Sequence, residues 1–227
     1  MEIKKHLLIN MNLAFTLSDV RLLAALALFL FVPSFPAQAF LTQETTTPKT
    51  FADWCLNQHN LSMETLRTIH AMLTVAQTKD CAQANELLSN RTELYLAYNS
   101  IAELKPLSTL TQLTFLDLSG NSIADLKPLA TLTNLTRLSL AYNSIADLKP
   151  LSTLTQLTSL DLFGNSIADL KPLSTLIQLT SLDLSGNSIA DLKPLLTLTN
   201  LTQLSLNDNQ MLTDKSCPVQ PESICRF

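Results

Sequence analysis

Glycine and histidine are scarce in this chain, which has three of each among 227 residues. Neither a glycine-rich phosphate-binding loop nor the glycine fingerprint of dinucleotide-binding sites is present. His6, His59 and His70 belong to no nucleophile–histidine or metal-ligand motif, so acid–base, covalent and metal-dependent catalysis lack their usual residues. The sequence therefore predicts a protein without enzymatic activity, cofactor or bound metal.

Basic residues are also too few for several classes of partner. Lysine and arginine number 15 against 19 aspartate and glutamate residues, which gives a formal net charge of −4. Nucleic acids and anionic membrane surfaces attract basic proteins, so this balance argues against both as main partners.

What the chain does contain is a repeat of 22 residues. The unit Leu113–Asn134 returns three more times, after a variant copy from Arg91 and before a truncated copy from Leu201. A fixed period of this length is the signature of a repeat architecture. Large apolar residues lie first two and then three positions apart, which predicts a short strand followed by 3₁₀ or irregular turns. They are Leu113, Leu116, Leu118, Ile123, Leu126, Leu129 and Leu132.

Two polar or rigid positions recur with the leucines. Asn121 and its equivalents follow the strand, where an amide can bond the main chain of its own and the next coil. Pro128 and its equivalents fix φ where the return segment begins. A single unit cannot bury enough apolar surface to fold alone, so the copies are expected to stack into a solenoid.

The pattern L-x-x-L-x-L-x-x-N-x-I-x-D-L-x-P-L-x-x-L, from Arg91 to about Met211, resembles the 22-residue class of leucine-rich repeats. That class includes bacterial internalins and a regulatory subunit of protein phosphatase 1. The resemblance implies an α/β solenoid, a right-handed horseshoe with a parallel sheet on its concave side and 3₁₀ or irregular turns on its convex side. It also implies protein binding without catalysis.

The first 39 residues differ from the rest. Lys4, Lys5 and Arg21 precede the apolar run Leu22–Val32, and Ala37-Gln38-Ala39 supplies a small-x-small cleavage site. We interpret residues 1–39 as a signal peptide; the alternative is a membrane anchor, although the run is shorter than the ~20 residues of a membrane span. After cleavage we expect no membrane insertion, and an exported protein that is periplasmic, surface-associated or secreted.

The flanks of the repeats are predicted to be a lead-in and two caps. Residues 40–50 are polar and rich in threonine, typical of a flexible lead-in, and residues 51–90 read as a helical N-terminal cap. Ser62 is its candidate N-cap residue. Residues 91–212 hold five full units and one partial unit, in which Met211 keeps the template, and residues 213–227 form a C-terminal cap.

The four cysteines lie in the two caps and not in the repeats. With an export signal, disulfides are the natural interpretation. The pairs Cys55–Cys81 and Cys217–Cys225 are favoured among three connectivities, because the solenoid holds its ends apart. A metal site is the alternative, but CxxC spacing and nearby histidines are absent.

Two ladders of charge run along the repeats, and each acid stands two residues from a lysine. We interpret them as a solvated face rather than a docking strip, because exposed pairs contribute little. The acids are Glu103, Asp125, Asp147, Asp169 and Asp191, and the bases are Lys105, Lys127, Lys149, Lys171 and Lys193.

Differences between the copies concentrate at four positions around the strand leucines. By strand alternation the third, fifth and seventh positions point away from the core onto the concave sheet, and the eighth lies at its rim. Aromatic residues and arginine, which are enriched in interface cores, gather there. The predicted partner-binding residues are Tyr95, Tyr98, Phe115, Asp117, Arg137, Tyr142, Asp161, Phe163 and Asp183. The alternative is that these positions vary because no packing constrains them.

These features predict an exported, disulfide-capped protein that binds a protein partner through its concave face. A glycan-binding module is the alternative, since tyrosine and phenylalanine beside aspartate also stack on sugars and hydrogen-bond to them. A structural protein of the cell envelope without a single ligand is a third possibility, because the repeats are nearly identical.

Overall fold

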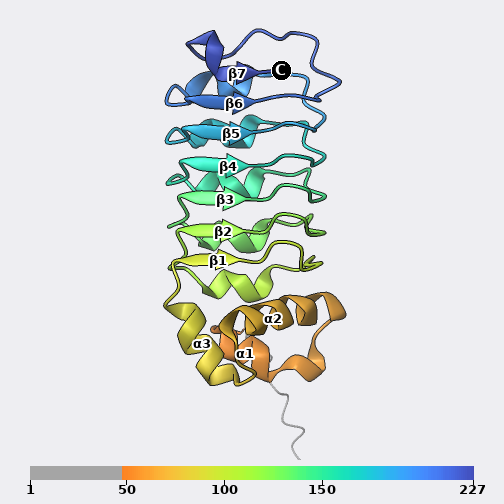
Figure 1. Ribbon diagram of the computed structural model, residues 1–227, viewed down its shortest axis with the longest axis vertical. Coiled ribbons are helices and arrows are strands. Elements are labelled where there is room, and N and C mark those ends of the chain that lie inside the picture. Colours follow the sequence, from red (N-terminus) through yellow and green to blue (C-terminus); the bar gives the residue numbers. More distant parts are fainter. Residues whose placement is uncertain (1–47) are drawn as a thin grey trace, which may run out of the picture. The chain divides into compact units, whose positions relative to one another are not determined.

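The computed structural model describes residues 48–227. The predicted signal peptide, residues 1–39, lies outside the described residues, as does most of the predicted lead-in, residues 40–50. Within the described part, a group of helices is followed by a stack of coils, which have a strand on one side and, in all but the last coil, a 3₁₀ turn on the other (Figure 1).

Three short α-helices lie between residue 48, where the described part begins, and the repeats. They are α1 (Phe51–Leu56), α2 (Met63–Ala76) and α3 (Cys81–Ser89), with a 3₁₀ turn η1 (Gln58–Asn60) between the first two. Ser62 caps α2 as predicted, because its side chain accepts a hydrogen bond from the Thr65 N–H. Helices α1 and α2 both contact the 3₁₀ turn of the first coil, so they cover its apolar end.

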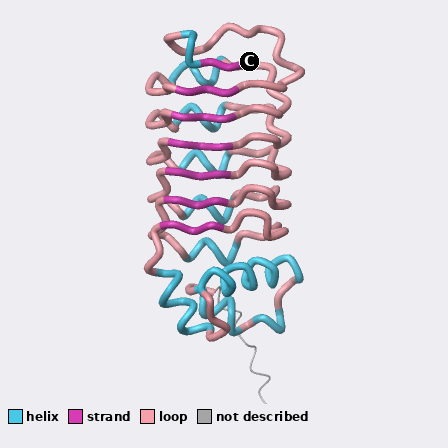
Figure 2. The backbone as a smooth tube through the Cα atoms, in the orientation of Figure 1, coloured by secondary structure: helices cyan, strands magenta, loops and turns pink. Residues whose placement is uncertain are grey.

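The coils supply one parallel sheet, in which neighbours in sequence are neighbours in space. Its strands, magenta in Figure 2, are three residues long because only the central leucine and its two neighbours extend before the chain turns. They are β1 (Glu93–Tyr95), β2 (Phe115–Asp117), β3 (Arg137–Ser139), β4 (Ser159–Asp161), β5 (Ser181–Asp183) and β6 (Gln203–Ser205).

The opposite side of each of the first five coils is a five-residue 3₁₀ turn that begins with Lys-Pro, where the fixed φ of proline suits the first turn. These turns are η2 (Lys105–Thr109), η3 (Lys127–Thr131), η4 (Lys149–Thr153), η5 (Lys171–Thr175) and η6 (Lys193–Thr197). The sheet on one side and 3₁₀ turns on the other confirm the predicted leucine-rich-repeat solenoid.

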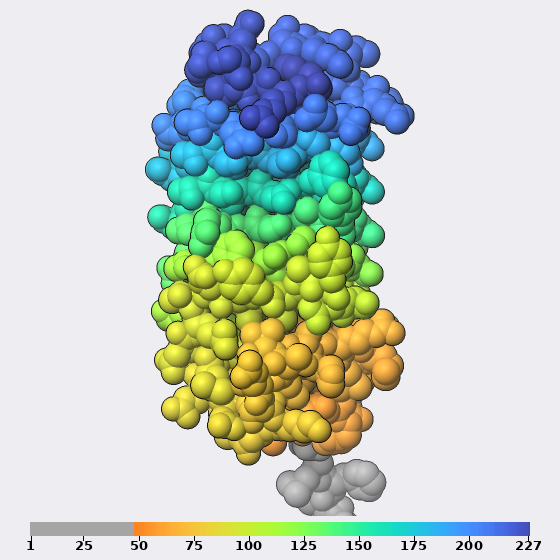
Figure 3. All heavy atoms as spheres, viewed as in Figure 1, coloured from red at the N-terminus to blue at the C-terminus, as the bar shows by residue number. Residues whose placement is uncertain are grey.

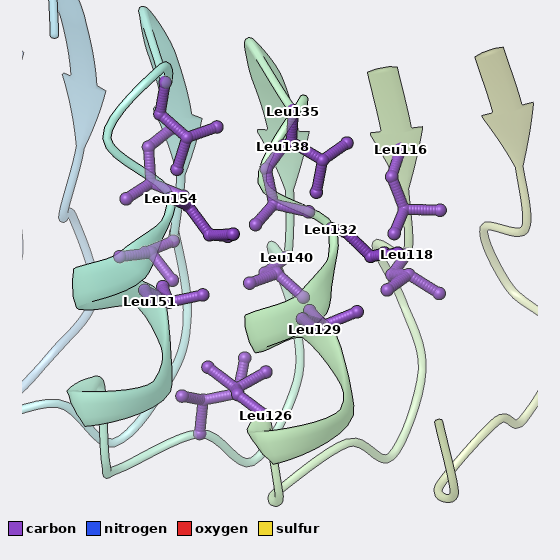
Figure 4. Close-up of a cluster of buried hydrophobic side chains, with 14 of the residues drawn as sticks. Leu116, Leu118, Leu126, Leu129, Leu132, Leu135, Leu138, Leu140, Leu151 and Leu154 are labelled. Carbon is purple, nitrogen blue, oxygen red and sulfur yellow. The ribbon is translucent and has the colours of Figure 1, made fainter. Parts of the chain in front are cut away.

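The core is a column of leucines between the sheet and the 3₁₀ turns. Figure 4 shows Leu116 and Leu118 from one coil beside Leu129 and Leu132 from its 3₁₀ side, with the next coil stacked against them. All seven apolar positions of the unit Leu113–Asn134 are at most 1% exposed. Burying each such side chain contributes about 1.5–3 kcal/mol, which the neighbouring coils make available.

A row of asparagine amides satisfies the main chain at the corner after each strand. Asn165 donates to Leu140 O and Leu162 O, both at 3.0 Å, and accepts from the Ile145 N–H at 3.0 Å. The predicted bond to its own coil is confirmed. The predicted bond to the next coil is wrong, because the amide bonds the preceding coil instead. Asn99 lacks these inter-coil bonds, since no repeat coil precedes it.

The C-terminal end differs from the prediction in two respects. Met211 was expected in the core but is 63% exposed, and Leu212 is buried instead at 6%, because a tight turn from Asn209 O to the Leu212 N–H shifts the chain by one residue. The tail then returns to the sheet through η7 (Glu222–Ile224) as a seventh parallel strand, β7 (Cys225–Arg226), which covers the edge of β6.

Both predicted disulfides are present. Cys55 in α1 is bonded to Cys81 in α3, with 5.6 Å between their Cα atoms, and ties the helical cap together. Cys217 is bonded to Cys225, with 5.8 Å between their Cα atoms, and holds β7 beside β6.

Candidate functional site

The outward side chains of β1–β6 and the residues that follow them form what we call the sheet face, seen from the front in Figure 3. The central leucine of each strand is buried and its two neighbours point outward, as in the exposed–buried–exposed pattern of β1. The parallel register aligns equivalent positions in rows. The third row is Glu93, Phe115, Arg137, Ser159, Ser181 and Gln203, and the fifth is Tyr95, Asp117, Ser139, Asp161, Asp183 and Ser205.

Three of the predicted residues meet at the β1 end of the sheet face. The rings of Tyr95 and Phe115 lie 5.0 Å apart between centroids, and the Arg137 guanidinium lies 4.6 Å from the centroid of Phe115. Arg137 also forms an ion pair of 3.0 Å with Glu93, whose other oxygen accepts a 2.9 Å hydrogen bond from the Tyr95 hydroxyl. We call Glu93, Tyr95, Phe115 and Arg137 the aromatic cluster.

Glu93 is a residue that the sequence-based prediction missed. It occupies the same row as Phe115 and Arg137, so its acidic charge beside an arginine was the available signal. The hydrogen bond that the Tyr95 hydroxyl donates to Glu93 raises the pKa of Tyr95. The partial burial of Tyr95 and the negative charge of Glu93 raise this pKa further. The cluster is electrically balanced and its groups hold one another, so it presents a pre-formed aromatic surface.

The fifth row continues as carboxylates. Asp161 and Asp183 lie opposite each other on adjacent strands, and Asp117 lies beyond Ser139. Each carboxylate is oriented by a backbone N–H two residues further along, at 3.1 Å from Phe163 to Asp161 and at 2.9 Å from Ser185 to Asp183. The pKa of Asp161 is raised, chiefly by burial and also by the negative charges of Asp183 and Asp117. The hydrogen bond from the Phe163 N–H acts in the opposite direction but does not cancel these effects. We call these three aspartates the acidic strip.

A second aromatic pair adjoins the acidic strip. Tyr142 and Phe163 make an edge-to-face contact with ring centroids 4.7 Å apart. Phe163 follows Asp161 by two residues and so lies on the same face. The nine predicted residues therefore form two aromatic groups with carboxylates beside them, rather than one continuous patch.

The rim of the sheet face holds two tyrosines in an unusual backbone conformation. Tyr98 and Tyr142 have φ of +57° and +54°, and are 76% and 56% exposed. The following coil has a glycine at the equivalent position, Gly120 and Gly164, and a Cβ atom there would meet the tyrosine ring. A left-handed backbone costs a residue other than glycine about 1–2 kcal/mol. The backbone at these two positions therefore favours glycine, yet both carry tyrosine.

The last strand adds a residue that no repeat template predicts. Arg226 pairs with Ser205 in the parallel register and is exposed at the far end of the fifth row. The tail does not follow the 22-residue pattern, so no signal in the sequence placed this arginine on the sheet face.

Residues 48–227 lack the features of two other kinds of site. No helix in this part of the chain has the length and apolar character needed to cross a membrane. The same residues contain no group of three or more histidine, cysteine, aspartate or glutamate side chains arranged to hold a metal ion.

Comparison with known proteins points to one family. A family profile described as leucine-rich repeats in two copies matches residues 92–131, 133–175 and 177–216. No curated protein matches the chain. Internalin C2 of Listeria monocytogenes is 39% identical in sequence, with a TM-score of 0.53 over 55% of each chain.

Two further solved structures extend the comparison. A second internalin of Listeria monocytogenes is 31% identical, with a TM-score of 0.52 over 67% of this chain and 52% of its own. A leucine-rich-repeat protein of Leptospira interrogans is 32% identical, with a TM-score of 0.51 over 60% of this chain and 34% of its own. The chain thus spans about half the length of these two internalins and 34% of the length of the Leptospira protein.

Proposed function

We propose that this chain, which belongs to the leucine-rich-repeat family, binds another protein through its sheet face. Members of the family are generally protein-interaction modules and are typically non-enzymatic. The proposal assigns binding to the aromatic cluster, the acidic strip and the rim tyrosines of this chain.

The observation that carries the proposal is the pair of rim tyrosines. Three of the six equivalent positions are glycine, whereas Tyr98 and Tyr142 keep large, exposed side chains at positive φ. Backbone strain that persists at exposed positions is a reason to infer function. Relaxed packing does not account for it, because a residue free to vary there would tend toward glycine or asparagine.

We further propose that the protein is exported. Two disulfides support this, because such bonds form and persist in oxidising compartments. The apolar run and Ala37-Gln38-Ala39 of residues 1–39 supply the matching signal. N-terminal sequencing of the exported chain tests it, with Phe40 expected as the first residue; retention of residues 1–39 on a membrane-bound product would support the anchor instead.

A capture experiment tests the binding proposal. The exported chain is used as bait for secreted and envelope proteins, beside the double variant Phe115→Ala/Arg137→Ala. The control variant is Ile177→Ala/Lys171→Ala, which removes an exposed apolar and a basic side chain away from the sheet face. We expect one captured species to be lost only from the sheet-face variant.

Two outcomes would overturn this proposal. Equal capture by all three baits would place binding elsewhere or favour a structural role. Release of the captured species by free saccharides would instead favour a glycan ligand. Thermal unfolding of each variant, followed by circular dichroism, checks that the solenoid is intact.

A further inference from the structure

We propose that the partner inserts a cationic side chain, arginine or lysine, between Asp161 and Asp183 on the sheet face. This inference rests on the proposed function and adds the chemistry of the partner. It comes from the charge left uncompensated on β4 and β5 and from the aromatic rings beside it.

The two carboxylates face each other without a counter-charge. Strand register places Asp161 directly beside Asp183, at the strand spacing of about 4.8 Å. Among the described residues, the ion pairs on the repeats join Lys105 to Glu103, Lys127 to Asp125 and Arg137 to Glu93, and none involves the acidic strip. Like charges directly opposite each other are unfavourable, and a cation placed between them would relieve this.

The other charged groups of the sheet face do not neutralise the pair. Arg137 is engaged by Glu93 and Phe115. Arg226 lies beyond Ser205, two strands from Asp183, and makes no ion pair with any residue from 48 to 227. Asp117 in the fifth row adds negative charge, as does Asp208, which takes the rim position of the last coil that Tyr98 takes in the first. The field at β4 and β5 is therefore set by carboxylates.

The surroundings suit an organic cation with an aliphatic stem. Phe163 lies two residues from Asp161, and the ring of Tyr142 packs edge to face against the ring of Phe163. Aromatic rings attract guanidinium and ammonium groups through their faces, and carboxylates add charge-assisted hydrogen bonds. Hydroxyl groups of Ser159 and Ser181, on the same two strands, add neutral polar contacts.

A metal ion fits this surface less well than a side chain. The described residues hold no cluster of three potential ligands, and calcium requires six or more oxygen atoms. The Oδ1 atoms of Asp161 and Asp183 already accept backbone hydrogen bonds, and Asp161 Oδ2 accepts a longer bond of 3.3 Å from the Ser139 hydroxyl, a neutral donor that leaves the charge uncompensated. What remains matches a guanidinium, which can bond two carboxylates at once.

Peptide selection tests the inference without a known partner. The full chain, in the form that the expressing cell exports, is the bait for a display library of short linear peptides. The test variant is Asp161→Asn/Asp183→Asn, in which the amide oxygen can still accept the backbone hydrogen bond. The matched control is Asp169→Asn/Asp191→Asn, which removes the same charge from the same two coils on the 3₁₀ side.

We expect arginine and lysine to be enriched in peptides selected by the unchanged chain and by the control, and not by the test variant. A selected peptide should bind the test variant about tenfold more weakly, and its affinity should fall as salt is raised. Replacing its cationic residue by glutamine should reproduce the loss.

Several results would overturn the inference. They are a pool without cationic enrichment, equal enrichment on all three baits, or equal losses in the test and control variants. A pool without cationic residues that still depends on Phe115 would reject the cationic partner while leaving sheet-face binding in place, so the two proposals fail separately. Binding of Ca²⁺ to the unchanged chain but not to the test variant would assign the carboxylates to a metal instead.

Discussion

The ring of Tyr142 lies over the backbone of Gly164 in the next coil, where an added Cβ atom would stand 3.1 Å from Tyr142 Cδ1. Both positions have positive φ, +54° at the tyrosine and +65° at the glycine. The same relationship joins Tyr98 to Gly120. The glycines thus provide the space that the strained tyrosines occupy.

We expect Gly164→Ala to lower the free energy of unfolding by about 1–2 kcal/mol, because alanine resists a left-handed backbone. Gly186→Ala is the control: it has the same φ of +65°, but its Cβ would meet only ordinary contacts at 3.4 Å or more. Tyr142 is half exposed and can turn away, so both variants should lose similar stability in urea unfolding. Only Gly164→Ala should alter the near-ultraviolet circular dichroism of the Tyr142–Phe163 pair; an unchanged spectrum would contradict the contact.

The asparagine ladder gives a second prediction. Asn165→Ala leaves Leu140 O and the Ile145 N–H without their amide partner in the interior, and an unsatisfied buried group costs about 1–3 kcal/mol. We expect a loss of about 2–4 kcal/mol in urea unfolding. Asn134→Ala is the control, because that exposed amide makes a single bond to Thr111 O. Equal losses in the two variants would mean that the ladder is dispensable.

The two disulfides are expected to contribute unequally. Cys55–Cys81 closes a separation of 26 residues and Cys217–Cys225 one of 8. The chain-entropy relation gives about 3.5 and 2.5 kcal/mol, respectively. Thermal unfolding of Cys55→Ser/Cys81→Ser and Cys217→Ser/Cys225→Ser should show the larger loss for the first. Emission from Trp54, the single tryptophan and a buried residue of α1, reports on the cap separately from the repeats.

The repeat made most of the fold predictable from the sequence, because one unit defines every other. Leu116 and Asn121 recur at a fixed period, and a strand one residue out of register would turn the leucine toward solvent. The positions of the residues outside the repeat pattern were harder to predict from the sequence. Leu212 replaces Met211 in the core through a local turn, and Arg226 reaches the sheet only after the tail folds back. Their positions depend on contacts between distant segments, which spacing does not encode.

The candidate site was predictable by row but not by contact. Strand alternation placed Phe115 and Arg137 side by side, and the structure brings them together. Strand alternation did not predict that Glu93 joins Tyr95 to Arg137. Side-chain rotamers decide which polar groups form hydrogen bonds, and the spacing of residues does not fix them.

That network predicts how tyrosine ionises. The hydrogen bond to Glu93 raises the pKa of Tyr95, so Glu93→Gln should lower the pH at which Tyr95 ionises. Absorbance in the near ultraviolet measures this as pH is raised. Glu103→Gln, which removes a carboxylate paired with Lys105 on another side of the first coil, should leave the titration unchanged. An identical shift in both variants would assign the effect to net charge rather than to the hydrogen bond.

The acidic strip predicts a change in stability with pH. Because the pKa of Asp161 is raised in the folded protein, the folded state binds more protons than the unfolded state just above the ordinary aspartate value of 3.8. Stability from this group is therefore lost as pH rises through the folded pKa. Asp161→Asn should be more stable than the unchanged chain at neutral pH, by about 0.2–1 kcal/mol for relief of a like-charge pair.

That difference should vanish below the ordinary pKa of aspartate, where the carboxyl is neutral in both states. Urea unfolding across this pH range measures it, with Asp169→Asn as the control for charge on the 3₁₀ side. A destabilised Asp161→Asn at neutral pH would show that the carboxylate is stabilised within the protein, and the strip would then lack the uncompensated charge that a cationic partner requires. A stabilising substitution that also weakens peptide binding would indicate that the chain keeps this repulsion for binding.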